Sequence, residues 1–153
     1  MSKFYLAYGS NMNREQMKYR CPTAAVVGVS ELKGYRLCFK GRADGNGVAA
    51  IEPCEDSTVP ILIWCISPED EKELDKFEGF PRLYEKAEFQ IELDGMQPFQ
   101  AMAYIMTPGK DYSIPAKYYY SMIFDAYKDL GFDTDILDEA VRFSLVRGAE
   151  NGN

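Results

Sequence analysis

The chain has 153 residues, of which 46% are hydrophobic and 27% are charged, and this suits one domain (residues 1–153) with a sizeable core. A formal net charge of -7 argues against a nucleic-acid-binding surface, and no apolar run is long enough to span a bilayer. We therefore expect neither a nucleic acid nor a membrane as a partner. The absence of histidine excludes Ser-His-Asp and Cys-His catalysis and His-ligated metals, which leaves a Glu or Asp of raised pKa as the usual proton carrier.

The first predicted element is a short strand over residues 4–8 that ends in a sharp turn. Phe4 to Tyr8 are consecutive aromatic or aliphatic residues, a pattern typical of a buried strand. Gly9 allows backbone angles that other residues resist, and Ser10 and Asn11 can bond to backbone or begin a helix. Such a turn leaves N–H groups without partners, which suits an anionic oxygen or a polarised carbonyl. The same pattern is also typical of an ordinary core strand followed by a glycine turn.

The next part of the chain predicts one short helix and several strands. A helix capped by Asn13 is expected to end at Cys21–Pro22. Alternating or continuous apolar residues predict strands over 24–29, 35–40, 48–51 and 61–66. Between them, residues 41–47 are expected to form a flexible loop and residues 53–60 a polar connection.

The second half of the chain predicts a helix, a hairpin and two further helices. Ser67 and Pro68 begin a helix that Gly79 ends. Strands over 84–93 and 99–105 flank an Asp-Gly turn and form the hairpin. One helix begins near Pro115 and ends at Gly131, and the next is capped by residue 133 or 134. The fold class is therefore α+β, with about six or seven strands curled into a small mixed β-barrel and flanking helices.

Glu78 is the carboxylate that stands out. It is expected in the last turn of its helix, where the negative end of the helix dipole disfavours the charged form. Phe77 and Phe80 can desolvate it, and both effects raise its pKa toward the range useful for proton transfer. A glutamate near a glycine at a helix end is also common without any function. Tyr84 and Tyr104 lie on the predicted hairpin and can either face the same cavity or pack in the core.

Three segments, taken together and in this order, resemble the gamma-glutamylcyclotransferase-like (AIG2-like) family. They are Tyr8-Gly9-Ser10-Asn11-Met12, residues 74–84 (LDKFEGFPRLY) and Tyr104-Ile105-Met106. The resemblance covers nearly the whole chain and implies a small mixed barrel with a cavity, and release of a γ-glutamyl group as 5-oxoproline. The resemblance also implies that Glu78 corresponds to the family's acid/base glutamate. It also implies a set of substrate-binding residues: Tyr5, Leu6, Ala7, Tyr8, Gly9, Ser10, Asn11, Tyr84 and Tyr104.

The implied chemistry suits a protein without histidine. The substrate's α-amine attacks its own γ-carbonyl, Glu78 takes a proton and returns it to the leaving amine, and the N–H groups near Gly9 and Ser10 face the oxyanion. No Ser or Cys nucleophile, cofactor or metal is required. The expected partner is a small γ-glutamyl amino acid, amine or peptide. Since no secretory signal is evident, a cytoplasmic location is expected.

Two alternatives stay open from the sequence. The same reaction can act on a γ-glutamyl-ε-lysine isopeptide or on a γ-glutamylated metabolite. The chain can also be a non-catalytic small-molecule-binding module that retains the pocket. The loop over 41–47 and the region after Asp133 vary within the family and are expected to govern the choice of leaving amine. The sequence gives neither that amine nor the oligomeric state.

Overall fold

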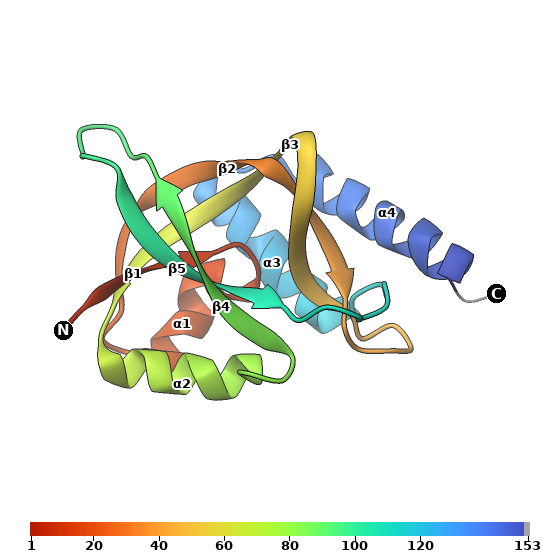
Figure 1. Ribbon diagram of the computed structural model, residues 1–153, viewed down its shortest axis with the longest axis horizontal. Coiled ribbons are helices and arrows are strands. Elements are labelled where there is room, and N and C mark those ends of the chain that lie inside the picture. Colours follow the sequence, from red (N-terminus) through yellow and green to blue (C-terminus); the bar gives the residue numbers. More distant parts are fainter. Residues whose placement is uncertain (152–153) are drawn as a thin grey trace.

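The computed structural model describes residues 1–151 of the chain, and within them a five-stranded sheet is flanked by four α-helices (Figure 1). In chain order the elements are β1 (Lys3–Ala7), a 3-10 turn η1 (Ser10–Met12), α1 (Arg14–Arg20), β2 (Ala25–Lys40), β3 (Val48–Ile66), α2 (Pro68–Glu78), β4 (Tyr84–Ile91), β5 (Phe99–Met106), α3 (Lys117–Leu130) and α4 (Asp135–Asn151). None of the described helices is both long and apolar enough to cross a membrane.

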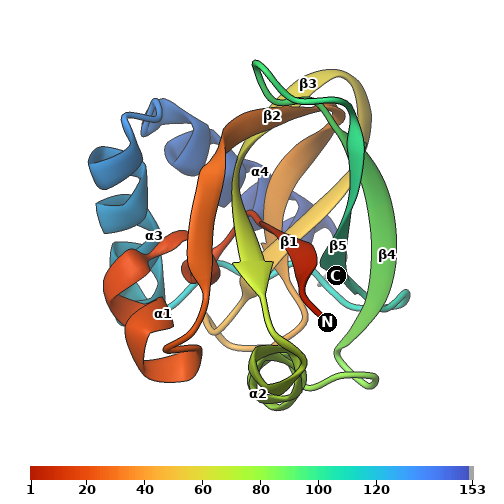
Figure 2. The same ribbon diagram turned by 90° about the vertical axis from the view of Figure 1, so that its left-hand side faces the viewer.

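The sheet is mixed and strongly curved. Its strand order is β2-β3-β1-β5-β4; β1 and β5 run parallel, and the other neighbours are antiparallel. Figure 2 shows how the strands curl around the interior. The edge strands β2 and β4 do not pair along their described lengths, although the Ser30 hydroxyl donates to the carbonyl of Glu92, just past β4, at 2.9 Å. The α+β class is confirmed, and the predicted barrel is a curled sheet that stops short of closure.

Two long strands replace four of the short strands that the sequence predicts. β2 spans both the 24–29 and the 35–40 segments, and β3 includes the expected polar connection over 53–60. In the register, Tyr35 pairs with Pro53 and Lys33 pairs with Thr58, so residues 54–57 bulge outward opposite Gly34. The bulge lets the pair bend without ending, and it interrupts the alternation that marks a strand in sequence. The described sheet therefore has five strands, not six or seven.

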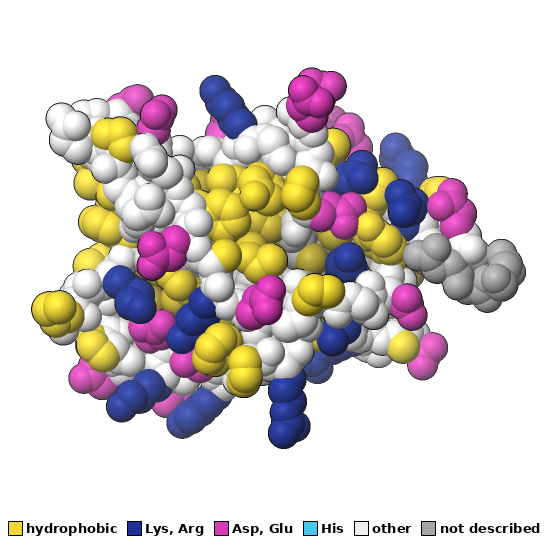
Figure 3. Space-filling view, in the orientation of Figure 1, with side chains coloured by type: hydrophobic (Ala, Val, Ile, Leu, Met, Phe, Trp, Pro, Cys, Tyr) yellow, Lys and Arg dark blue, Asp and Glu magenta, His cyan; other side chains and the backbone are white. Residues whose placement is uncertain are grey.

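The helices pack on different parts of the sheet and so leave room for a cavity. α4 lies against β2, where the buried Ser144 hydroxyl accepts from the Phe39 backbone N–H at 2.8 Å. α1 and α3 both contact η1. α2 lies beside α1 and is connected to β4 by Lys86, which contacts Glu71 at 2.8 Å. On the face shown in Figure 3, hydrophobic side chains gather at the centre and charged side chains surround them.

Candidate active site

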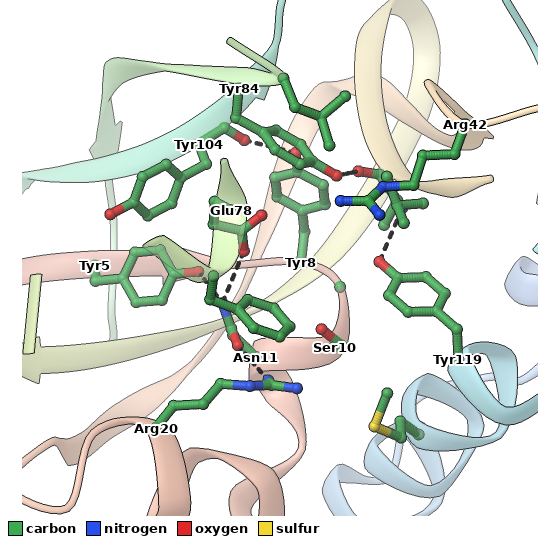
Figure 4. Close-up of a pocket in the computed structure, with 16 residues that line it drawn as sticks. Tyr5, Tyr8, Ser10, Asn11, Arg20, Arg42, Glu78, Tyr84, Tyr104 and Tyr119 are labelled. Carbon is green, nitrogen blue, oxygen red and sulfur yellow. Dashed lines mark hydrogen bonds between the residues drawn. The ribbon is translucent and has the colours of Figure 1, made fainter. Parts of the chain in front are cut away.

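A cavity of about 260 Å³ lies where β1, η1, the end of α2 and the start of α3 meet (Figure 4). It is also lined from α1, the 41–47 loop, the start of β3, and both strands of the β4–β5 hairpin. Eight of the residues expected at a substrate site line it: Tyr5, Tyr8, Gly9, Ser10, Asn11, Glu78, Tyr84 and Tyr104. Glu78 and the bend at Gly9–Ser10 therefore open onto one space, which is the arrangement that an enzymatic role requires.

Leu6 and Ala7 are not at the cavity. Both side chains are only 1% exposed and lie in the core, where their strand pairs with Ile63 and Leu62 of β3. The resemblance pointed to the whole segment from Tyr5 to Ser10. Of this segment, the residues that line the cavity are Tyr5, Tyr8, Gly9 and Ser10.

Gly9 occupies a position where close packing leaves no room for a side chain. Its φ of -125° is outside the left-handed region, while its ψ of -134° is outside the helical and extended regions that other residues prefer. A Cβ atom at this position would lie 2.9 Å from the Cβ of Ala49 on β3, closer than side chains pack. The bend continues into η1, whose first hydrogen bonds run from Met12 N to Gly9 O and from Asn13 N to Ser10 O, each at 3.0 Å. The N–H groups of Gly9, Ser10 and Asn11 precede these bonds and have no partner within the turn.

The two ends of α2 place Glu78 at the cavity. Ser67 and Asp70 form a capping box, in which each side chain bonds to the other's backbone N–H, at 3.1 and 3.0 Å. At the other end Gly79 adopts the left-handed conformation, with φ of 67°, as the sequence predicts for a helix stop. Glu78 is the last residue of the helix, and its Oε1 accepts from the Asn11 side-chain amide at 2.9 Å.

Burial raises the pKa of Glu78 from its usual 4.5 to about 7. The positive charge of Arg20 opposes this rise most strongly, followed by the hydrogen bond from Asn11 and the charge of Arg42. The raised pKa expected from the sequence is confirmed, but its leading cause is desolvation inside the cavity. A carboxyl group with this pKa exchanges protons readily near neutral pH.

Arg20 fixes the orientation of Asn11. Its Nη1 donates to Asn11 Oδ1 at 2.6 Å, while the guanidinium lies 3.6 Å from the ring centroid of Phe77. Since a guanidinium can only donate, the amide oxygen of Asn11 must face it. The amide nitrogen is left to donate to Tyr5 Oη and Glu78 Oε1, both at 2.9 Å. Arg20 thus holds the donor that contacts the Glu78 carboxylate, a role that its sequence position at the end of α1 does not reveal.

The tyrosines shape the wall of the cavity through bonds to the protein. Tyr8 donates to the carbonyl of Tyr104 at 2.6 Å, and Tyr84 donates to the carbonyl of Ala49 at 2.5 Å. The Tyr104 hydroxyl donates to Asp75 at 2.6 Å and points away from Glu78 (Figure 4), so its ring and not its hydroxyl meets the cavity. Burial raises the pKa of Tyr8, Tyr84 and Tyr104, which keeps these hydroxyls protonated.

Several residues that line the cavity were not among those predicted from the sequence. Arg20, Arg42 and Tyr119 come from α1, the 41–47 loop and α3, and only the fold brings them to the same cavity as Glu78. Tyr119 accepts from the backbone N–H of Ala49 at 2.9 Å, where the helical pattern of α3 predicted only core packing. Among the described residues, no group of three or more His, Cys, Asp or Glu side chains is placed to hold a metal ion.

Comparison with known proteins gives a consistent set of matches. Residues 5–121 match the family model described as "Gamma-glutamyl cyclotransferase, AIG2-like". A human protein named gamma-glutamylcyclotransferase is 28% identical over 114 residues, which are 69% of this chain and 60% of that protein. The chain therefore spans about 60% of the length of this curated relative.

Solved structures share the fold at low sequence identity. One named gamma-glutamyl cyclotransferase has a TM-score of 0.76 at 23% identity, over 92% of this chain and 86% of the other. An uncharacterized protein from Homo sapiens has a TM-score of 0.79 at 24% identity, over 91% and 86% of the two chains. YkqA from Bacillus subtilis has a TM-score of 0.75 at 20% identity, over 94% of this chain and 54% of its own.

Proposed function

Since the chain belongs to the AIG2-like gamma-glutamyl cyclotransferase family, we propose that it releases 5-oxoproline from a γ-glutamyl amino acid, amine or peptide. The observation that supports this most is the position of Glu78. Its carboxyl group, with a pKa of about 7, lines the same small cavity as the bend at Gly9–Ser10. A proton carrier and a set of fixed N–H donors are the two parts that this reaction requires.

The reaction begins with a proton transfer. The α-ammonium group of the substrate must lose a proton before its nitrogen can attack the γ-carbonyl carbon. Glu78 in its ionised form accepts that proton. Attack then forms the new C–N bond of the five-membered ring and turns the carbonyl oxygen into an oxyanion.

The breakdown of this intermediate returns the proton. The leaving nitrogen is an amide N–H and must depart as an amine, so protonated Glu78 donates to it as the C–N bond breaks. Of the three protons of the original ammonium group, one stays on the ring nitrogen and two end on the leaving ammonium group. One carboxyl group that titrates near neutral pH can carry them in turn, because each transfer restores it.

Fixed hydrogen-bond donors and a folded substrate would supply the rest of the rate enhancement. The N–H groups of Gly9 and Ser10 are suited to the oxyanion, because the bend holds them in place before the reaction. The nucleophile is part of the substrate, so the cavity has only to hold it in a ring-like pose. Well-oriented intramolecular reactions reach effective molarities of roughly 10⁵ M or more.

The test is a measurement of 5-oxoproline release from a panel of γ-glutamyl compounds. The panel includes γ-glutamyl amino acids, γ-glutamyl amines, γ-glutamyl-ε-lysine and a γ-glutamyl peptide. Glu78→Gln is expected to abolish turnover while the ligand still binds, because the amide keeps the shape and loses the proton exchange. Release at the wild-type rate by this variant would overturn the assignment. Binding without release by the wild-type protein would instead indicate a binding module.

A further inference from the structure

The cavity holds more positive than negative charge. Among the described residues that line it, the charged side chains are Arg20, Arg42 and Glu78. With Glu78 ionised, these three leave one positive charge in excess. The glutamyl group of a substrate leaves this excess unchanged, because its α-ammonium and α-carboxylate groups add no net charge. The excess is therefore available to the leaving group.

The two arginines differ in how far they are already engaged. Arg20 is half-buried, donates to Asn11 at 2.6 Å and stacks on Phe77 at 3.6 Å. Arg42 is exposed, and it makes no hydrogen bond or ion pair with another described residue. Figure 4 shows it reaching toward the cavity from a different side of Glu78 than Arg20 does. Its guanidinium has all its donors free for a ligand.

The loop that carries Arg42 is anchored at both of its ends. Gly41 N donates to Asp111 O and Gly47 N donates to Ile114 O, each at 2.9 Å. Gly41 has a φ of 100°, and a Cβ atom there would lie 2.9 Å from the sulfur of Met106. The backbone next to Arg42 is thus fixed at the cavity, and its side chain lines the cavity while remaining accessible to solvent. Because Arg42 and Glu78 line the same cavity, a leaving group that extends from a γ-carbonyl beside Glu78 toward the 41–47 loop would meet this guanidinium.

We propose that Arg42 binds a carboxylate on the leaving group, so that the preferred substrates are γ-glutamyl amino acids or peptides and not neutral or cationic γ-glutamyl amines. The inference rests on the proposed function, and it narrows the substrate class. A γ-glutamyl amino acid carries one net negative charge and neutralises the cavity. A γ-glutamyl amine leaves the cavity's charge unbalanced, and a γ-glutamylated polyamine adds to it.

The experiment compares two substrates that differ in one group. γ-Glutamyl-alanine and γ-glutamyl-alaninamide have nearly the same shape, but only the first has a carboxylate on the leaving amine. Arg42→Gln is expected to lower the ratio of their kcat/KM values by roughly 5- to 20-fold, as for a charge-assisted hydrogen bond at a partly exposed site. The ratio is the informative quantity, because the charge of Arg42 also affects Glu78 and hence both substrates alike. Arg82→Gln removes the same charge outside the cavity and is the matched control.

A binding measurement separates this inference from the proposed function. Calorimetric titration of Glu78→Gln with both compounds is expected to show tighter binding of the acid, and this preference should disappear when Arg42→Gln is added and weaken at high salt. Preferential binding without any release would contradict the proposed function and support the role of Arg42. If Arg42→Gln releases 5-oxoproline with an unchanged ratio of kcat/KM values for the two substrates, the role of Arg42 is overturned and the proposed reaction is unaffected.

Discussion

Replacement of Glu78 by Gln should stabilise the fold in a pH-dependent way. In the folded state burial holds the pKa of Glu78 at about 7, whereas the usual value for an unfolded glutamate is 4.5. Between these two pH values the folded protein binds the extra proton, so wild-type stability is full below about 4.5 and falls as the pH rises through 7. Gln resembles the protonated acid, and its amide oxygen can still accept from Asn11.

The size of the effect follows from the shift. At roughly 1.4 kcal/mol per pH unit, the rise of the pKa from 4.5 to about 7 corresponds to about 3.5 kcal/mol. Solvent that reaches the carboxylate through the cavity reduces this to about 2–3 kcal/mol. The free energy of unfolding of the variant should therefore exceed that of the wild type by about 2–3 kcal/mol above pH 7. Below pH 4.5 this pH-dependent part of the difference should vanish.

Urea unfolding of both proteins across this pH range measures the difference directly. Groups that titrate in both proteins cancel in it, so the curve isolates Glu78. Glu88→Gln, at an exposed position of β4, controls for the change in net charge. A difference that stays constant from pH 4.5 to 8 would refute the reasoning, because it would mean that the carboxyl is not held in its protonated form by the fold.

The remaining predictions concern the rate and the packing around the site. The kcat/KM for 5-oxoproline release should rise about tenfold per pH unit below 7 and level off above it, because Glu78 must be ionised to accept the first proton; a flat profile would exclude that role. Gly9→Ala should lower the free energy of unfolding by about 1–3 kcal/mol in urea and reduce turnover, because its Cβ would lie 2.9 Å from that of Ala49. Wild-type stability in this variant would show that the contact relaxes without cost. Tyr127→Phe should raise the free energy of unfolding by about 1 kcal/mol, because this buried hydroxyl has no hydrogen-bond partner among the described residues; a loss of stability by calorimetry would reveal one.

Some parts of the fold could be predicted because their signals are local. Asn13 caps α1 by accepting from Gln16 N at 3.1 Å, as its position in the sequence indicated. The alternating residues of 84–91 and 99–106 pair as an antiparallel hairpin, since alternation reports directly on a sheet with one buried face. The full extent of the two long strands, β2 and β3, could not be predicted in the same way. Polar residues at the bulge of β3 look like a loop when their partners on β2 are unknown.

The residues of the candidate site likewise differ in whether the sequence alone could reveal them. Its motif residues were found because the order of short segments is itself information, and this led to Glu78 and the Gly9 bend. Arg20 and Arg42 were not among the predicted site residues, since an arginine at a helix end or in a loop is usually solvated. The resemblance indicated only that the loop carrying Arg42 would influence the choice of leaving amine. Tyr104 was placed correctly, but the direction of its hydroxyl, toward Asp75, depends on a helix 29 residues away.

Local signals in the sequence decided where several helices begin and end and which hairpin forms. These features depend on residues within a few positions of each other, through capping, periodicity and turn conformation. The tertiary structure alone decided that Asn11 and Glu78, 67 residues apart, share a hydrogen bond, and that Arg20 orients the one toward the other. It also set the pKa of Glu78, because desolvation depends on how many distant segments pack around a carboxylate, and no stretch of chain contains that information.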